Sequence, residues 1–435
     1  MADETVLRIK ERIRQEMRDL LGVTMADGGS IDRQALPSQI DGVAHEVCTD
    51  FGISDENWIG YIIKSTIDDF IGLGPLQPLQ DDPKVAEIFI DPVGVEPNGT
   101  FITPVARAEV DGQIVDCPGI DLVSHDEVGR LIGRIAEEAN RRCDDSFPEM
   151  DATLADGSRV HAAHPKVSPN GWSLNIRKFS KDKLTAEDLL ERGAMSEPMY
   201  MFLKSAVKAR ANFIISGGTG SGKTTMLNAL SAFIGYNERV VTIEDTRELQ
   251  LKQRIVIPRV ACPPNSEGKG EFTMHELLVG ALRERPDRIV VGECRDDETY
   301  EMLQAMQTGH DGSLTTIHAN DCAGAFTRIE NMILKSQGNM TMEAIRRQIG
   351  AAIDVVVQVK RWRGGYRRIE SITAVEGFSD GNVTRNELFH WEGSPENGRH
   401  VATGYQPARL KEKILDEDAE YDPRWFCLLY TSDAA

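Results

Sequence analysis

The sequence predicts an α/β fold with a largely parallel sheet, preceded by a mixed α+β domain and an N-terminal helical segment. Three observations lead to this prediction. An apolar strand, a glycine-rich turn and a helical pattern follow one another within residues 212–233. Three further apolar strands, at 240–243, 288–291 and 313–317, alternate with helical segments, which is typical of a parallel sheet covered on both faces. Upstream of residue 180 the pattern changes to short strands and turns.

The glycine-rich turn carries the strongest motif in the chain. The apolar run 213–215 precedes it, and a helical pattern with one apolar face follows it. The spacing G-x-x-x-x-G-K-[ST] in this strand–loop–helix setting predicts a phosphate-binding loop rather than a plain glycine turn. Backbone N–H groups and the helix N-terminus can surround phosphate oxygens, Lys223 can reach the β- and γ-phosphates, and the Thr224 hydroxyl can ligate Mg²⁺. The predicted nucleotide-binding residues of this loop are Gly217, Gly218, Thr219, Gly220, Ser221, Gly222, Lys223, Thr224 and Thr225.

The composition restricts the classes of function. With 435 residues the chain is expected to form two or three domains. Its net charge of -20 argues against strong general binding to nucleic acid, which depends on basic groups. The seven cysteines include no C-x-x-C pair, which argues against a zinc ribbon and suits a reducing cytosol. No apolar run reaches the length of a membrane span and the N-terminus lacks signal-peptide features, so we expect a cytoplasmic protein that meets membranes only through partners.

The elements upstream of the loop follow in order. Helices are expected at 1–22, near 41–51 and at 57–71 from the spacing of their apolar residues. The α+β domain then shows a strand at 86–90, turn signals at Asn98-Gly99 and Asp111-Gly112, a helix at 126–139, a hairpin over 152–162 and a last strand at 173–179. Thr185 and Asp188 have the spacing of a capping box and begin the second domain.

The end of the chain has little pattern. Residues 355–359 and 366–375 flank a glycine turn and are expected to form an antiparallel hairpin, whereas residues after about 390 are polar. The segment from Trp425 onward resembles a translated adapter and is left out of the fold prediction. The predicted boundaries are 1–56 for the helical segment, 57–179 for the α+β domain, 180–190 for a linker, 191–395 for the P-loop domain and 396–435 for a poorly patterned tail.

Each strand after the phosphate loop ends in polar or ionisable residues. Glu244 and Glu248 follow strand 240–243, Glu293 follows 288–291, and His318 follows 313–317. Because parallel strands deliver their carboxyl ends to one edge of the sheet, this arrangement predicts a nucleotide-hydrolysing centre. Glu293 could polarise the attacking water, Glu248 and Glu244 could position water or hydrated Mg²⁺, and His318 could sense the γ-phosphate. We therefore predict Glu293, Glu248 and His318 as catalytic residues, and Thr224, Glu248 and Glu293 as the metal-binding set.

Four ordered segments resemble the secretion-superfamily traffic ATPases: GGTGSGKTT, TIEDTREL, LRERPDRIVVGECR and TGHDGSLTTIHAN. Residues 57–378 carry the resemblance. The segments around the loop and over IRRQIGAAIDVVVQVKRWRGGYRRIESITAVEGF look most like the Tad/Flp pilus-assembly branch (CpaF type), with the VirB-type secretion branch next. Cys294 after Glu293 and the pair Asp296-Asp297 depart from the usual pattern. The absence of a tetracysteine module disfavours the type II secretion branch.

The resemblance implies a RecA-like motor domain behind a PAS-like N-terminal domain, with ATP and Mg²⁺ as cofactors. It also implies a homohexamer that acts on an inner-membrane platform protein. By the same similarity, Arg159 and Arg177 would contact phosphates from the N-terminal domain, although ordinary strand surface charge explains them equally well.

Two other classes of function are considered. A DNA-transfer motor of the VirB type would draw on the basic residues Lys360, Arg361, Arg363, Arg367 and Arg368. A solvated hairpin is the preferred interpretation of these residues, because the chain as a whole is acidic. A nucleotide-gated assembly scaffold with little hydrolysis is the other class, and the presence of Glu293 and Glu248 argues against it.

Overall fold

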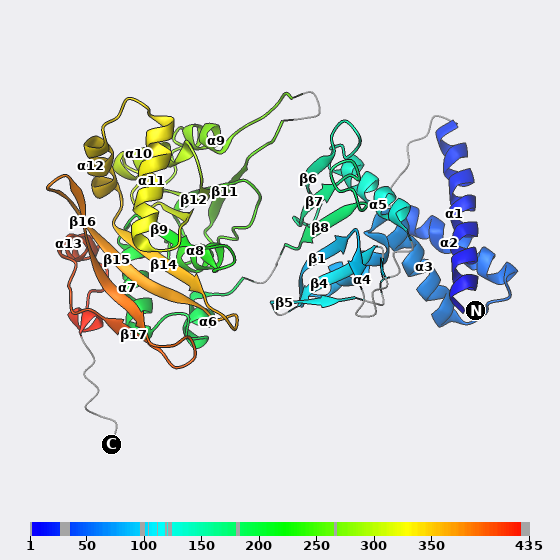
Figure 1. Cartoon of the computed structure of the whole chain (residues 1–435), viewed down its shortest axis with the longest axis horizontal. Helices are drawn as coiled ribbons and strands as arrows, with labels where there is room; N and C mark the ends of the chain where they lie inside the picture. The colour runs from blue at the N-terminus through cyan, green and yellow to red at the C-terminus, as the bar shows by residue number, and fades with distance from the viewer. Residues whose placement is uncertain are drawn as a thin grey trace, which may run out of the picture. The chain divides into compact units, whose positions relative to one another are not determined.

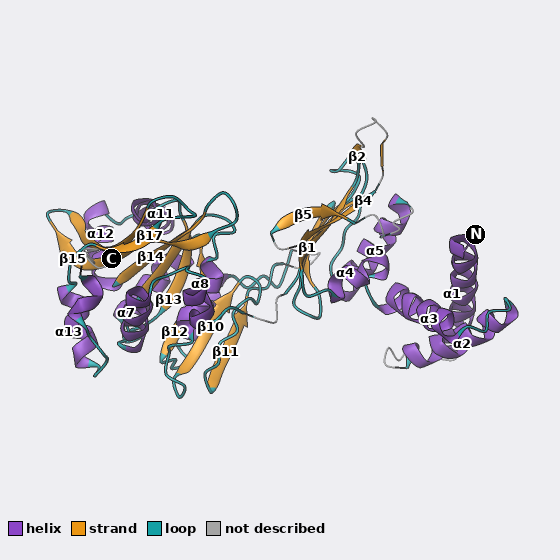
Figure 2. Ribbon diagram, turned by 90° about the horizontal axis from the view of Figure 1, so that it is seen from below, coloured by secondary structure: helices purple, strands orange, loops and turns teal. Residues whose placement is uncertain are grey.

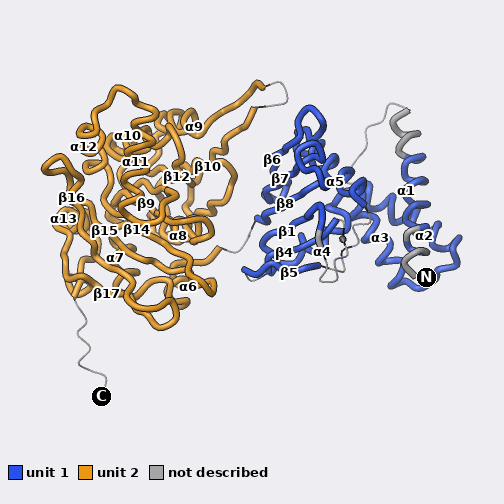
Figure 3. Tube along the Cα trace, viewed as in Figure 1, with its two compact units in different colours: residues 1–180 blue, residues 181–435 orange. Residues whose placement is uncertain are grey.

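The computed structural model divides the chain into two compact units, Met1–Ser180 and Lys181–Ala435 (Figure 3). Each unit has two hydrophobic cores of its own. The structure describes residues 2–26, 35–95, 101–102, 104–110, 112–117, 120, 124–179, 183–264 and 268–427.

Three helices open the first unit, α1 (Ala2–Ala26), α2 (Leu36–Asp50) and α3 (Glu56–Ile71) (Figure 1). All three predicted helices are thus confirmed. The buried side chains of α3 share one core with those of α1 and α2, so this helix packs with the helical segment and not, as predicted, with the α+β domain. Although α1 has 25 residues, it is amphipathic. In the described part of the chain no helix is long and apolar enough to cross a bilayer.

A six-stranded antiparallel sheet forms the rest of the first unit. Its strand order is β5-β4-β1-β8-β7-β6. Helix α5 packs against it with Val128, Leu131 and Ile132, which are buried in the same core as the inward residues of the strands. The turn predicted at Asn98-Gly99 lies outside the described residues. The elements are η1 (Gly74–Leu76), α4 (Gln77–Asp81), β1 (Val85–Asp91), β4 (Val105–Val110), β5 (Gln113–Asp116), α5 (His125–Glu138), β6 (Glu149–Thr153), β7 (Arg159–Ala163), β8 (Ser173–Arg177) and a separate pair, β2 (Gly94–Val95) with β3 (Phe101–Ile102).

The second unit is built on a nine-stranded sheet in the order β11-β10-β12-β13-β9-β14-β15-β16-β17. The pairs from β11 through β14 are parallel, and the remaining pairs are antiparallel. The strands are β9 (Phe213–Gly217), β10 (Arg239–Glu244), β11 (Ile255–Val260), β12 (Arg288–Cys294), β13 (Leu314–His318), β14 (Val355–Arg361), β15 (Arg367–Ser379), β16 (Asn382–Glu392) and β17 (Arg399–Ala402).

Helices cover both faces of this sheet (Figures 1 and 2). Within β9, Phe213 and Ile215 enter one core while Ile214 enters the other, because successive side chains point to opposite faces. The predicted parallel sheet with two covered faces is therefore confirmed. One core includes α6 (Ala186–Glu191), α7 (Glu197–Lys208), α8 (Lys223–Ser231) and α13 (Ala408–Asp416), and the other includes α9 (Met274–Ala281), α10 (Glu298–Gln307), α11 (Cys322–Ser336) and α12 (Met342–Ala352).

The predicted linker, 180–190, overlaps a folded element. The Thr185 side chain accepts a hydrogen bond from the Asp188 N–H, and the Asp188 carboxylate accepts one from the Thr185 N–H at 2.7 Å. This confirms the capping box, which starts α6. Ala186 and Leu189 are buried in the core of the second unit, so the packed structure begins before residue 191.

The described part of the tail predicted at 396–435, residues 396–427, is folded. It contains β17, α13 and a short helix, η2 (Pro423–Phe426). The Phe426 ring lies 5.4 Å from that of Phe202 and 5.7 Å from that of Phe389, and Trp425 is also buried. These residues complete the core, so the prediction that left Trp425 and Phe426 out of the fold is wrong. Residues 428–435 lie outside the described part.

Helix α13 is held to the sheet by a buried carboxylate. Asp354 is fully buried and accepts the Asn212 N–H at 2.8 Å, directly before β9. Lys413 and Arg409 from α13 form ion pairs with it at 2.9 and 3.1 Å. Because a buried charge needs partners, this cluster ties the C-terminal helix to the start of the central strand.

His400 on β17 makes the second unit sensitive to acid. Its Nε2 lies 3.0 Å from the Ile369 carbonyl oxygen, and its ring lies 4.8 Å from that of Trp391. Burial lowers the pKa of His400 from 6.5 to about 4. At a pH between these two values, His400 is protonated in the unfolded chain and neutral in the folded chain. The free energy of unfolding therefore falls as the pH drops below 6.5.

Lowering the pH from about 7.5 to about 5 is expected to reduce the free energy of unfolding of the unmodified protein by about 2 kcal/mol more than that of His400→Gln. Glutamine keeps a hydrogen-bond donor but does not titrate. Urea denaturation at the two pH values measures the difference, since other titrating groups contribute equally to both proteins. An equal loss in both proteins would contradict the assignment to His400.

Candidate nucleotide site

The predicted phosphate loop connects β9 to α8 at the centre of the sheet. The fully buried strand ends at Gly217, and the helix begins at Lys223 with Gly222 as its N-cap. Lys223 Nζ donates a hydrogen bond to the Gly218 carbonyl oxygen at 3.1 Å, and Ser221 Oγ donates to the same oxygen at 2.8 Å. The ammonium group thus folds back over the loop, where bound phosphates would lie.

Glycine is required at particular points of this loop. Gly220 and Gly222 have φ values of 67° and 94°, in the region that L side chains rarely adopt. A Cβ atom on Gly217 would lie 2.4 Å from Ser221 Oγ and 2.5 Å from the Val359 carbonyl oxygen. Glycine at these positions therefore lets the backbone form a tight concave loop, whose interior would be filled by the side chains of other residues.

The register of the strands brings two other segments to the loop. Gly217 of β9 pairs with His318 of β13 on one side and with Val359 of β14 on the other. The carboxyl ends of three parallel strands therefore meet at the same level. The structure places His318, as predicted, beside the start of the phosphate loop.

Glu293 lies in a β-bulge at the end of β12. Val291 pairs with Thr315 and Cys294 pairs with Ile317, so Gly292 and Glu293 together face Thr316 alone. Thr316 Oγ1 donates to the Gly292 carbonyl oxygen at 2.7 Å and holds the bulge in place. Bulges re-aim side chains next to active sites, and here the bulge carries the predicted catalytic carboxylate.

Arg295 fixes that carboxylate. It donates to Glu293 at 2.9 Å and to Asp245, just after β10, at 3.0 Å. The hydrogen bond to Glu293 also raises the pKa of Arg295, so the cation persists at all ordinary pH values. The sequence prediction missed Arg295 and Asp245, although each adjoins a predicted acidic residue.

Glu244 and Glu248 have different positions. Glu244 is buried, and its Oε1 accepts the N–H groups of Glu248 at 2.8 Å and Leu249 at 2.9 Å. Asn228 of α8 binds the same segment through the Gln250 N–H at 2.8 Å. Glu244 therefore holds the loop that contains the half-buried Glu248, and this loop packs against α8, the helix that follows the phosphate loop. These bonds give Glu244 a structural part in the loop through one of its two carboxylate oxygens.

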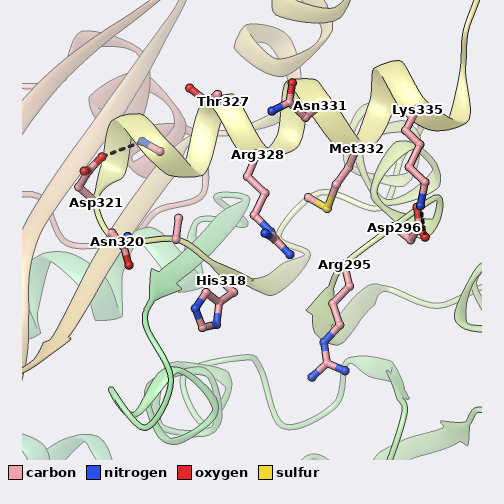
Figure 4. A pocket seen from close by; sticks show the side chains of 12 residues that line it. Arg295, Asp296, His318, Asn320, Asp321, Thr327, Arg328, Asn331, Met332 and Lys335 are labelled. Carbon is pink, nitrogen blue, oxygen red and sulfur yellow. Dashed lines mark hydrogen bonds and ion pairs between the residues drawn. The ribbon is translucent and has the colours of Figure 1, made fainter.

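His318 borders an open pocket of about 620 Å³ beside the phosphate loop (Figure 4). Arg328 projects from α11 toward His318 and Arg295, and all three residues line this pocket (Figure 4). Burial and the positive charge of Lys223 lower the pKa of His318, while Glu293 opposes this shift. His318 is therefore neutral at physiological pH and can both accept and donate a hydrogen bond.

Cys294 is fully buried, and burial raises its pKa. Its sulfur lies 3.2 Å from Thr315 Oγ1 in the core. Cys294 thus packs as a small core residue, and a buried thiol with a raised pKa is a poor nucleophile.

Arg159 and Arg177 lie in the first unit, directly opposite each other in the antiparallel pair β7 and β8. Arg177 is exposed and forms an ion pair with Glu87 of β1 at 3.5 Å. The Glu87 carboxylate offsets part of the repulsion between the two facing arginines. The sequence alone did not show that these two arginines face each other.

The basic hairpin contacts the phosphate loop. Arg367 Nε donates to the Gly220 carbonyl oxygen at 2.9 Å. A Cβ atom on Gly220 would lie 3.2 Å from a terminal nitrogen of Arg361. Arg361 and Arg367 are exposed, in agreement with the solvated hairpin, but the parallel register of β14 with β9 also brings them to the loop.

The residues present fit a nucleoside triphosphate. A tight loop with left-handed glycines, a lysine folded over it and further cations beside it match a polyphosphate. Among the described residues no three His, Cys, Asp or Glu side chains group into a metal site.

Comparison with known proteins agrees with this geometry. Residues 119–363 match the family described as type II/IV secretion system protein. The conjugal transfer protein TrbB of Rhizobium radiobacter is 30% identical over 328 residues, which cover 74% of this chain and 92% of that protein. An uncharacterized protein of Methanocaldococcus jannaschii is 48% identical over 199 residues, 44% of this chain, but the match spans only 28% of that protein.

Among solved structures, the pilus retraction motor PilT with bound ADP matches with a TM-score of 0.51 and 17% identity. The match covers 79% of this chain and 86% of that one. This likeness concerns the fold, a RecA-like α/β domain preceded by an N-terminal domain. The family match over residues 119–363, more than half of the chain, shows that the chain belongs to the type II/IV secretion system family of ATPases.

Proposed function

We propose that this protein is a Mg²⁺-dependent ATP-hydrolysing motor that powers assembly of a Tad/Flp-type pilus or protein secretion across the bacterial envelope. The observation that carries the proposal is the convergence of the phosphate loop, the β12 bulge with Glu293 and the end of β13 with His318 at one edge of the sheet. A binding module needs only the loop, whereas hydrolysis also needs groups that orient water.

Each residue has a defined part in this proposal. The loop Gly217–Thr225 binds the phosphates through its N–H groups, and Lys223 neutralises their charge. Mg²⁺, held by the Thr224 hydroxyl with Glu248 and Glu293 near it, would neutralise further charge on the phosphates. Glu293 orients and polarises the attacking water, and the neutral His318 senses the γ-phosphate through a hydrogen bond.

We propose that Arg159 and Arg177 bind the nucleotide phosphates from the first unit. Their facing positions on β7 and β8 support this role, since both side chains leave the same face of the sheet and could contact one polyanion. Arg177→Ala is expected to lower ATP turnover about tenfold while leaving the fold intact, because a charge-assisted contact is lost. Steady-state hydrolysis, with thermal melting as the check on folding, measures this. Turnover equal to that of the unmodified protein would exclude Arg177 from phosphate binding.

We further propose a homohexamer at the cytoplasmic face of the inner membrane, where it acts on a platform protein of the pilus or secretion machine. Family membership supports this. ATP-dependent closure of the first unit over the nucleotide would do mechanical work, provided that ATP and ADP favour different arrangements. The acidic net charge supports a protein partner over nucleic acid.

A VirB-type conjugation ATPase is the second candidate function, favoured by the similarity to a conjugal transfer protein. The two candidates differ in the cellular process that fails when the gene is removed. Loss of pili or secreted protein with normal DNA transfer would support the first, and the reverse would support the second. A scaffold with negligible hydrolysis remains the third class.

Steady-state ATP hydrolysis by the purified full-length chain, with Mg²⁺ and with EDTA, tests the enzymatic proposal. Turnover that requires Mg²⁺ is the expected result. Nucleotide-dependent ring formation without turnover would instead favour the scaffold.

A further inference from the structure

The hairpin of β14 and β15 extends beyond the end of the central strand. Val359 of β14 pairs with Gly217, the last residue of β9. Lys360 and Arg361 therefore continue alongside the phosphate loop, where β9 has already turned away. After the turn, β15 starts at Arg367, directly opposite Arg361.

The four basic residues of the two strands lie in facing pairs on opposite faces of the hairpin, Lys360 with Arg368 and Arg361 with Arg367. Facing residues of antiparallel strands point to the same side, and the next pair points to the other. Lys360 forms an ion pair with Glu370, and the Arg368 guanidinium lies 4.4 Å from the centre of the Trp391 ring. Lys360 and Arg368 therefore have partners on the face of the hairpin that points away from the loop.

The other pair, Arg361 and Arg367, lies against the loop. Arg367 donates to the Gly220 carbonyl oxygen at 2.9 Å, and its Cδ would lie 3.8 Å from a Cβ atom on Gly222. Arg361 approaches Gly220 from the facing strand. With Lys223, three permanent cations surround one short loop in a chain whose net charge is -20.

We propose that Arg361 and Arg367 bind the polyphosphate of the nucleotide from the hairpin side of the loop, an inference that rests on the proposed ATPase function. Two guanidinium groups at facing positions repel each other. A polyphosphate bound between them and the loop would attract both groups and offset this repulsion. Arginine suits the role because its planar fork stays charged and matches phosphate oxygens. The hydrogen bond to Gly220 holds the group in place before the nucleotide arrives.

Equilibrium binding of a fluorescent ADP analogue to the full-length protein, with inorganic pyrophosphate as competitor, tests this. Arg361→Gln and Arg367→Gln remove the charge but keep a hydrogen-bond donor. Each is expected to weaken binding of ADP and of pyrophosphate about five- to tenfold and to reduce the dependence of affinity on salt. Arg363→Gln, at the exposed turn of the same hairpin, is the matched control and should bind like the unmodified protein.

Arg367→Lys keeps the charge without the planar fork, and it is expected to recover the salt dependence but only part of the affinity. Unchanged affinity in both glutamine variants would overturn the inference while leaving the ATPase proposal intact. A salt dependence in Arg367→Lys that is reduced as much as in Arg367→Gln would also overturn it, because the charge at this position would then not act on the nucleotide. Failure of the unmodified protein to bind nucleotide would overturn both proposals.

Discussion

Replacing Glu293 with glutamine is expected to reduce ATP turnover by about a hundredfold or more, with little change in nucleotide affinity. The carboxylate sits in the β12 bulge, held by Arg295 at 2.9 Å. Glutamine has the same shape and can still meet Arg295 through its carbonyl oxygen. It cannot accept a proton from water, so the chemical step should fail while the phosphate loop continues to bind.

The test compares steady-state turnover with equilibrium binding of ADP in the same preparations. Glu412→Gln, on the exposed surface of α13 in the same unit, is the matched control and should match the unmodified protein. Equal turnover in Glu293→Gln and the unmodified protein would remove Glu293 from the chemistry. A parallel loss of binding would mean that the residue shapes the site instead.

Replacing Lys223 with alanine is expected to weaken ATP binding at least tenfold and to lower turnover by about a hundredfold or more. The lysine is the first residue of α8, and its Nζ donates to the Gly218 carbonyl oxygen at 3.1 Å. In the nucleotide complex that charge would neutralise the β- and γ-phosphates. Both ground-state binding and the transition state should therefore suffer.

Titration with a fluorescent nucleotide and hydrolysis at saturating ATP measure the two effects separately. Lys208→Ala, at the exposed end of α7, removes an equivalent charge away from the site and serves as the control. Nucleotide affinity that survives in Lys223→Ala would show that other cations dominate phosphate binding. Arg361 and Arg367 would then be the first to examine.

Elements whose cause lies within a few consecutive residues could be predicted from the sequence. The strand–loop–helix of the phosphate loop and the capping box at Thr185 are of this kind. The three N-terminal helices and the alternating strands and helices of the sheet also follow from local apolar periodicity. Parallel strands in an open sheet place their carboxyl ends together, so the meeting of His318 with the loop could be expected as well.

Only the tertiary structure decided the features that depend on contacts between distant segments. Arg367 meets Gly220 because β14 pairs with β9 in one particular register, which no local pattern specifies. Glu244 accepts the N–H groups of Glu248 and Leu249 because the chain turns back onto it after β10. Phe426 belongs to the core through aromatic partners far away in the sequence, and a sparse apolar pattern gives no sign of such partners. The sequence by itself thus determined the nucleotide-binding loop and the sheet around it, while strand register and side-chain packing determined which charges surround that loop.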